Sequence, residues 1–227
     1  MTVAEAGANV ARMSESRPLP TFEVEAAELA GAAGPVAGVD EAGRGPWAGP
    51  VVAAAVVLDP DRIPDGIDDS KALEPEAREE IYRRIVASAR FGVGIAHVAR
   101  IDRVNILNAT LWAMRQAVAA LEHRPRVVLI DGNQAPRMRC TTRTIVGGDA
   151  TCLSIAAASI VAKVTRDRWM IELAQKLPGY GFERHKGYGT PEHQEALTRL
   201  GASIQHRRSF RPVKIALGLV AEPDEVE

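Results

Sequence analysis

The run Val127-Val128-Leu129-Ile130 is apolar at four successive positions and ends at Asp131. A strand with one face in water alternates polar and apolar side chains, whereas an unbroken apolar run is typical of a strand covered on both faces. The sequence therefore predicts a central strand in a sheet with helices packed on it. An acid at the end of such a strand is costly to bury unless a cation meets it, which makes Asp131 a candidate functional residue.

Other strand and helix signals surround this strand. The Val- and Ala-rich runs 36–40 and 51–58 are predicted strands, as is 91–97, and 143–146 is predicted to be a short edge strand. Apolar side chains at helical spacing predict helices, which cover residues 21–33, 75–86, 102–121, 151–176, 192–200 and 212–219. Strands that alternate with helices predict an α/β or α+β architecture.

A chain of 227 residues can bury one substantial core, so we expect one compact domain. Residues 1–33 are expected to form a partly mobile leader, residues 34–220 the domain, with a helical C-terminal part from about 178, and residues 221–227 an acidic tail. No apolar run reaches the length of a membrane span, and the N-terminus lacks the pattern of a signal peptide. We therefore expect a cytoplasmic protein.

The net charge of −1 argues against a protein that coats nucleic acid without specificity. The charge is unevenly distributed, because residues 184–214 contain seven Lys or Arg against Glu192 and Glu195. A local basic surface is therefore available. The two cysteines, Cys140 and Cys152, match no zinc-binding spacing.

Four acids stand where predicted strands end or helices begin, namely Asp40, Glu41, Asp131 and Asp149. Sheet enzymes place their sites in loops at strand ends, and carboxylates gathered there repel one another unless a hard divalent cation neutralises them. Each acid alone has an ordinary explanation, because Asp149 can cap a helix, Asp131-Gly132 is a common turn, and Asp40-Glu41 can be a surface pair. Their joint occurrence favours a metal site.

A glycine-rich segment, residues 42–50, directly follows the first two acids. Its pattern Gly43-Arg44-Gly45-Pro46-Trp47-Ala48-Gly49 differs from the dinucleotide-binding fingerprint, because the third glycine comes one place late. No Gly-Lys-Ser/Thr follows, so the segment is not a P-loop, and a nucleotide cofactor is not expected. Exposed N–H groups and the guanidinium of Arg44 beside the acids suit contact with a sugar-phosphate backbone.

Specific motifs run along most of the chain, from about Val36 to Leu217. They are, in order, Val39-Asp40-Glu41-Ala42-Gly43-Arg44-Gly45-Pro46, Ala48-Gly49-Pro50-Val51, Asp69-Ser70-Lys71 with Leu73, Asn105-Ile106-Leu107, Ile130-Asp131-Gly132-Asn133, Gly147-Gly148-Asp149, Ser154-Ile155-Ala156-Ala157-Ala158-Ser159-Ile160, Ala162-Lys163-Val164-Thr165-Arg166-Asp167, His185-Lys186-Gly187-Tyr188-Gly189-Thr190 and His206-Arg207-Arg208-Ser209-Phe210. The set resembles the type 2 ribonucleases H in their single-chain prokaryotic form. Trp47 stands where that family usually has an aliphatic residue, and Arg103 where an acid is common.

The resemblance implies a ribonuclease-H-like mixed sheet flanked by helices, with a small helical C-terminal part. It implies that the four acids are the catalytic carboxylates and hold Mg²⁺ or Mn²⁺. It further implies that Gly43, Arg44 and Gly45 sense the ribose 2′-hydroxyl, and that Tyr188 stacks on the sugar of the next, deoxy, nucleotide. We also expect phosphate contacts from Lys71, Lys186, Arg207, Arg208 and Arg211. For Lys71 a plain surface lysine is the alternative.

The activity implied is a metal-dependent endoribonuclease that hydrolyses the RNA strand of RNA/DNA hybrids and cuts 5′ of ribonucleotides embedded in duplex DNA. Two ions would activate the attacking water and stabilise the leaving 3′-oxygen, giving 3′-hydroxyl and 5′-phosphate ends. Its expected setting is ribonucleotide excision, DNA replication and repair, as a monomer without membrane contact. The C-terminus shows no aromatic sliding-clamp motif. Two alternatives stay open: another metal nuclease of the same fold, such as a junction resolvase, and a non-catalytic hybrid-binding module.

Overall fold

Five strands form one mixed sheet in the order β3-β2-β1-β4-β5 in the computed structural model, which describes residues 18–31 and 34–221. The strands are β1 (Val36–Ala42), β2 (Val51–Val57), β3 (Arg90–Ala96), β4 (Val127–Asp131) and β5 (Thr141–Ile145). β1 pairs antiparallel with β2 and parallel with β4, while β2 pairs antiparallel with β3 and β4 pairs parallel with β5. β1 is therefore the central strand.

The register of β1 against β4 brings two acids to the same edge of the sheet. Val39 lies opposite Ile130. Because the two strands are parallel, the residues that follow, Asp40 and Asp131, reach that edge side by side. The sheet topology thus joins two of the predicted site residues from distant parts of the chain.

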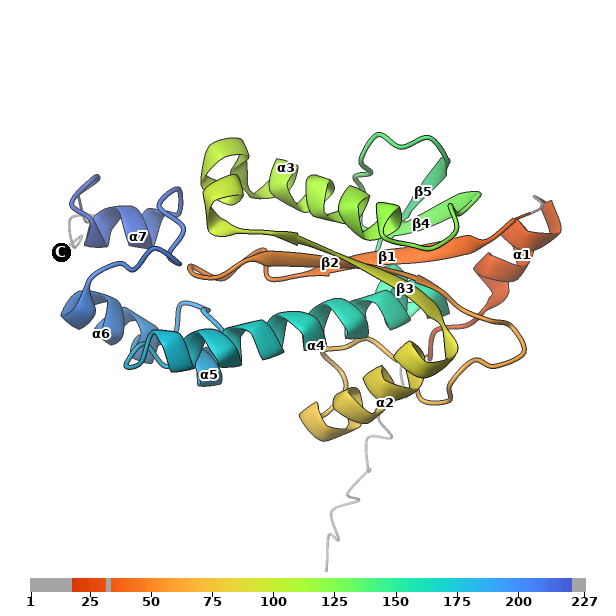
Figure 1. Cartoon of the computed structure of the whole chain (residues 1–227), viewed down its shortest axis with the longest axis horizontal. Coiled ribbons are helices and arrows are strands. Elements are labelled where there is room, and N and C mark those ends of the chain that lie inside the picture. The colour runs from red at the N-terminus through yellow and green to blue at the C-terminus, as the bar shows by residue number, and fades with distance from the viewer. Residues whose placement is uncertain (1–17, 32–33, 222–227) are drawn as a thin grey trace, which may run out of the picture.

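Helices cover both faces of the sheet (Figure 1). α3 (Val98–Ala119) packs on one face, and α4 (Leu153–Lys176) crosses the other with α2 (Pro75–Ser88) against it. α4 approaches β1 very closely, because a Cβ added to Gly38 would lie 2.1 Å from the backbone carbonyl carbon of Ser154. This architecture confirms the predicted mixed sheet flanked by helices.

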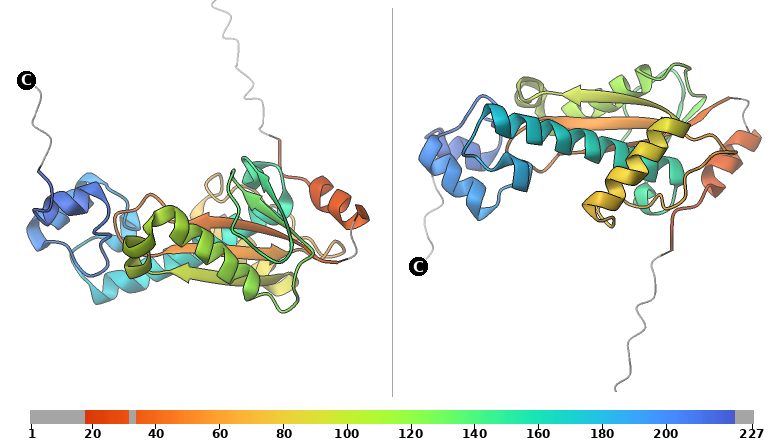
Figure 2. Two further views of the ribbon diagram at one scale, coloured as in Figure 1. Left: turned by 90° about the horizontal axis from the view of Figure 1, so that it is seen from above. Right: turned by 60° about the horizontal axis from the view of Figure 1, so that its bottom comes forward.

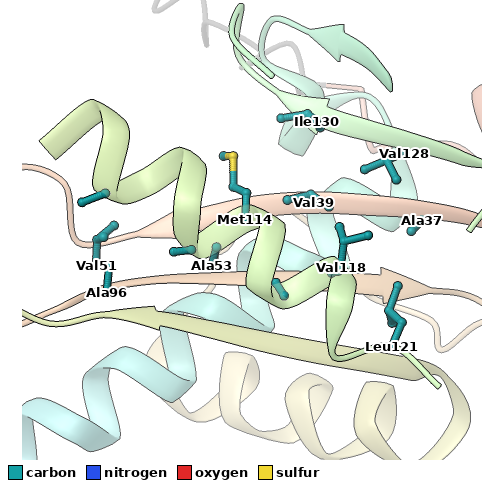
Figure 3. Packing of buried hydrophobic residues seen from close by; sticks show 14 of the residues in the cluster. Ala37, Val39, Val51, Ala53, Ala96, Met114, Val118, Leu121, Val128 and Ile130 are labelled. Carbon is teal, nitrogen blue, oxygen red and sulfur yellow. The ribbon is translucent and has the colours of Figure 1, made fainter. Parts of the chain in front are cut away.

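Apolar side chains fill both interfaces. Figure 3 shows the cluster between the sheet and α3, which includes Val39, Met114 and Val128. On the other face, Leu129 belongs to a cluster with Ile155 of α4. The run 127–130 is thus covered on both faces, as its apolar pattern predicted, although β4 lies one place from the edge and β1 is the central strand.

Three short helices, α5 (Phe182–His185), α6 (Pro191–Leu200) and α7 (Arg211–Ala216), form one end of the molecule (Figure 2). Buried side chains of this part pack against the last turns of α4 through Met170 and Leu173. α5 had no counterpart in the predicted elements, because four residues give too short a pattern to recognise.

The starts of α3 and α4 differ from the predicted ones. α3 begins at Val98, four residues before the predicted start, and its backbone breaks at Asn105, which has φ 65° and ψ 167°. α4 begins at Leu153, because residues 148–150 form the separate 3₁₀ turn η1 (Gly148–Ala150). The capping role considered for Asp149 is therefore absent, since Cys152 occupies the N-cap of α4.

Part of the predicted leader packs on the domain. α1 (Glu23–Gly31) buries Glu25, whose Oε1 accepts hydrogen bonds from the backbone N–H of Ser154 at 2.6 Å and from Sγ of Cys152 at 3.1 Å. The rest of the leader, residues 1–17 and 32–33, and nearly all of the acidic tail, residues 222–227, lie outside the described residues. Over the two described ranges, no helix has both the length and the apolar character needed to cross a membrane.

Candidate active site

The four predicted acids gather at one edge of the sheet. Asp40 lies near the carboxyl end of β1 and is buried, and its neighbour Glu41 is half-buried. Asp131 ends β4, and its Oδ1 accepts a hydrogen bond from the backbone N–H of Gly148 at 2.7 Å. That bond ties the end of β4 to η1, the turn that carries Asp149.

These acids interact electrostatically. Burial and the negative charges of Glu41 and Asp131 raise the pKa of Asp40 well above its ordinary value. Burial also raises the pKa of Glu41, against the opposing charge of Arg44. Burial and the charge of Asp131 raise the pKa of Asp149. The site therefore concentrates negative charge, and a bound cation would relieve the repulsion.

Two cationic side chains already lie beside the acids. Nη1 of Arg44 is 3.2 Å from Oε1 of Glu41, and Nζ of Lys71 is 3.7 Å from Oδ2 of Asp149. Burial opposes the charged form of Lys71, yet the surrounding carboxylates, Asp149 among them, raise the pKa of this lysine overall. Two of the predicted substrate-binding cations, Arg44 and Lys71, thus lie at the edge of the acid cluster.

The chemistry of this donor set fits a divalent cation. Carboxylate oxygens are the ligands that Mg²⁺ and Mn²⁺ prefer, and their mutual repulsion would be relieved on binding. Within residues 18–31 and 34–221, no three His, Cys, Asp or Glu side chains are already arranged as a ligand group.

Two buried arginines support the segment 43–50, which we call the glycine loop. Arg166 of α4 donates hydrogen bonds to the carbonyls of Ala48, Pro50 and Lys186. Arg207 donates to the carbonyls of Gly43, Arg44, Gly49 and Pro50.

Neither guanidinium has a carboxylate partner among the described residues, so the carbonyl dipoles compensate both charges. Burial lowers the pKa of Arg166 to about 10. Burial and the charge of Arg166 lower the pKa of Arg207 to about 9. Close packing also explains Gly43, since a Cβ there would lie 1.9 Å from Nε of Arg166.

The burial of Arg207 contradicts its predicted phosphate contact. Its side chain is fully buried, and its guanidinium is engaged by the glycine loop, so it cannot reach a bound strand. Arg208 and Arg211 are exposed. Lys186 is half-buried, and its Nζ donates a hydrogen bond to the carbonyl of Glu183. Burial lowers the pKa of Lys186.

A hollow of about 270 Å³ lies beside the acids. Glu41, Gly43, Arg44, Gly45, Lys71 and Tyr188 line it. Tyr188 is 47% exposed, and a Cβ on Gly45 would lie 3.6 Å from its ring. The predicted sensing loop and stacking ring therefore share one concavity. Larger cavities, of about 690 and 710 Å³, lie near Arg124 and Cys140 and contain none of the predicted site residues.

Three polar residues that lie in the quoted motifs but had no predicted site role line the same hollow, Ser70, Ser159 and Lys163. Oγ of Ser70 and Oγ of Ser159 are 2.7 Å apart, and Ser159 also hydrogen-bonds Asp40. Nζ of Lys163 pairs with Asp167 at 2.9 Å. The small residues Ser154, Ala158 and Ser159 on one face of α4 were the available signal, because they allow α4 to approach the end of β1.

Comparisons with known proteins agree with this geometry. The family described as Ribonuclease HII matches residues 37–213. A ribonuclease HII of Bradyrhizobium diazoefficiens is 57% identical over 207 residues, which cover 91% of this chain and 79% of the relative. One of Nitrobacter hamburgensis is 60% identical over 197 residues, covering 87% and 74%. The crystal structure of ribonuclease H2 from Pyrococcus horikoshii OT3 superposes with a TM-score of 0.69 at 28% identity, covering 81% of this chain and 97% of that one.

Proposed function

Because this chain belongs to the ribonuclease HII family, whose members are metal-dependent endoribonucleases acting on RNA/DNA hybrids, we propose that it also cuts 5′ of single ribonucleotides embedded in duplex DNA. The observation that carries this proposal is the shared hollow. Glu41, one of the acids that would cut, the glycine loop that would sense a 2′-hydroxyl and Tyr188 all line it. Membership in a hydrolytic family argues against the alternative of a non-catalytic hybrid-binding module.

Asp40, Glu41, Asp131 and Asp149 are the residues that would hold Mg²⁺ or Mn²⁺. When bound, a pair of such ions supplies the positive charge that activates water and stabilises the leaving 3′-oxygen. Asp131 keeps η1 in register with β4 through the N–H of Gly148, so that Asp149 reaches the other acids. The products would carry 3′-hydroxyl and 5′-phosphate ends.

The glycine loop and Tyr188 would select the substrate. The backbone at Gly43 and Gly45 and the side chain of Arg44 lie next to the acids and would read the 2′-hydroxyl. The exposed ring of Tyr188 would stack on the sugar of the following deoxynucleotide. Lys71, Lys186 and Arg208 would contact phosphates, so binding would weaken with salt.

The test is cleavage-site mapping on a duplex that carries one ribonucleotide, in Mg²⁺ and in Mn²⁺, with the all-DNA duplex and an RNA/DNA hybrid as controls. We expect a single cut 5′ of the ribonucleotide, with a 3′-hydroxyl end, and no cut in the all-DNA duplex. Cleavage of a branched all-DNA junction would instead favour a resolvase of the same fold. A hybrid-specific enzyme that leaves the single ribonucleotide intact would overturn the proposal.

A further inference from the structure

Three buried histidines lie against the turn that carries Tyr188. His193 and His206 are fully buried and His185 is nearly so. The rings of His185 and His193 stack with their centres 4.5 Å apart, and the surrounding aromatic side chains are Trp47, Tyr180 and Phe182. The proposed cleavage chemistry uses none of these imidazoles. The directions of their hydrogen bonds indicate what they do.

The position of each proton follows from partners whose roles are fixed. The backbone N–H of Ser203 donates to Nδ1 of His206 at 3.0 Å, so this nitrogen is unprotonated. In a neutral imidazole the proton is then on Nε2, which lies 3.1 Å from Nε2 of His193. His193 therefore accepts at Nε2 and carries its proton on Nδ1. That Nδ1–H donates to the carbonyl oxygen of Tyr188 at 2.9 Å.

The result is a chain of hydrogen bonds with one direction, from Ser203 through His206 and His193 to Tyr188. A proton added to either ring breaks the chain, because two N–H groups would then point at each other. Burial lowers the pKa of His193. Burial and the charge of His193 lower the pKa of His206 to about 4. Both rings are therefore neutral at neutral pH, and the direction of the chain is preserved.

Tyr188 is anchored through its backbone while its ring extends into the hollow. Its carbonyl also accepts from the N–H of Thr190, and its own N–H donates to the carbonyl of His185, both at 2.9 Å. The preceding carbonyl, that of Gly187, accepts from the N–H of Trp47 at 2.8 Å. Because an exposed ring has few side-chain contacts to hold it, the backbone anchor sets where it lies.

We propose that His193 and His206 are positioning residues for Tyr188, which they hold at the place where its ring meets the sugar beside a single ribonucleotide. This inference rests on the proposed function, in which Tyr188 selects the junction between a ribonucleotide and a deoxynucleotide. It assigns part of that selectivity to buried imidazoles outside the hollow. A long hybrid offers a ribonucleotide at every step, so a misplaced ring reduces its cleavage less.

The test uses two substitutions of similar size at His193. His193→Asn places an amide N–H near the former Nδ1 and can still donate to the carbonyl of Tyr188. His193→Gln places its amide near the former Nε2 and loses that donor. kcat and KM are measured on a single-ribonucleotide duplex and on a long hybrid, with thermal unfolding as the check on folding. His123→Gln, at an exposed histidine after α3, is the matched control.

For His193→Gln we expect kcat on the single-ribonucleotide duplex to fall about tenfold, the effect of one buried hydrogen bond, with KM and the long-hybrid rate within about threefold of wild type. His193→Asn and His123→Gln should stay within about threefold on both substrates. Equal losses on both substrates, or an Asn variant as impaired as the Gln variant, overturn the positioning role. A wild-type enzyme that ignores the single ribonucleotide overturns the proposed function together with it.

A second measurement does not depend on activity. Two-bond ¹⁵N–¹H correlation spectra of the wild-type chain near neutral pH report the tautomer of each imidazole. We expect His193 to carry its proton on Nδ1 and His206 on Nε2. The opposite tautomer at His193 would overturn the chain of hydrogen bonds, whatever the cleavage assays give.

Discussion

The guanidinium of Arg207 donates from Nη1 to the backbone carbonyl of Arg44 at 2.7 Å, so a buried arginine holds the backbone of an exposed one. The contact joins the C-terminal helical part to the glycine loop. The side chain of Arg44 is left to Glu41 and to solvent. The buried guanidinium of Arg207, which no substrate contacts, thus fixes the glycine loop, which would face the substrate.

Replacing Arg207 with Lys should destabilise the chain. The planar guanidinium of Arg207 donates hydrogen bonds to four backbone carbonyls, and a lysine ammonium cannot reach all of them. We expect the free energy of unfolding to fall by about 2–4 kcal/mol, because buried carbonyls lose their partners. Chemical denaturation measures the change.

Arg208→Gln is the matched comparison, one residue later and exposed. It should change stability by no more than about 0.5 kcal/mol and lower the slope of log affinity against log salt by about one. Arg207→Gln, which removes the charge, should leave that slope unchanged. A lower slope in Arg207→Gln would support the phosphate contact that the burial of Arg207 contradicts.

Asp131→Asn should reduce cleavage of an RNA/DNA hybrid in Mg²⁺ at least about a hundredfold, because an amide lacks the charge that a hard cation requires. Without metal the melting temperature should not fall, since the change removes repulsion with Asp40 and Asp149. Asp61→Asn, at an exposed acid, is the control and should cut normally. Undiminished cleavage by Asp131→Asn would remove Asp131 from the site.

Tyr188→Ala should impair cleavage of the single-ribonucleotide duplex about tenfold to a hundredfold and cleavage of a long hybrid less, because base or sugar stacking on an aromatic ring contributes about 1–3 kcal/mol. Tyr188→Phe keeps the ring and should retain most of the activity on both substrates. Steady-state rates on the two substrates give the comparison. Equal losses on both would count against stacking at the junction.

Gly38→Ala should destabilise the fold by about 3 kcal/mol, because the new Cβ would meet the backbone of Ser154 and push α4 off β1. Gly31→Ala is the matched control, since a Cβ at this helix end meets nothing within 4 Å. It should be neutral or slightly stabilising. Thermal unfolding compares the two variants, and equal effects would argue against the close approach of α4.

Acid should destabilise the chain through His206. Its pKa is about 4 in the folded state, against an ordinary value of about 6.5 when unfolded. Above both values His206 contributes no pH dependence. Between them the unfolded chain binds a proton that the folded chain does not, so the free energy of unfolding falls by about 3 kcal/mol as pH drops from 6.5 to 4.

Other titratable groups of the chain act in two directions. His193 has a lowered pKa and adds to the loss, whereas raised pKa values at Asp40, Glu41 and Asp149 oppose it. Denaturation of wild type and His206→Gln across this pH range therefore isolates the contribution of His206. Parallel stability curves for the two proteins would contradict the assigned shift.

The sequence was sufficient to predict those elements whose apolar residues follow a clear pattern. Apolar runs placed β1 and β4, and with them the strand ends at which Asp40 and Asp131 lie. The break at Asn105 escaped prediction because a single residue with φ 65° leaves the apolar spacing of α3 intact. A helix boundary shifts for the same reason, since apolar spacing does not specify which turn begins it.

The burial of two charged side chains was harder to predict. Arginine is ordinarily a surface residue, and no sequence feature within several positions of Arg166 or Arg207 indicates that its side chain is buried. Apart from Lys186, their partners are carbonyls of a loop more than a hundred positions earlier in the chain, so the compensation exists only in the folded protein. The same holds for the histidine chain, in which His206 meets His193 across a helix and a turn.

The pairing of Val39 with Ile130 has a consequence for the order in which the molecule is assembled. β1, β2 and β3 follow one another and pair as neighbours, whereas β4 joins β1 only after α2, β3 and α3 have been made. Closing so long a loop is slow, so a growing chain can pair β1, β2 and β3 while it carries only the first two acids. The cleavage centre is therefore expected to appear late in synthesis, and a chain that stops before residue 131 should fold in part and cut nothing.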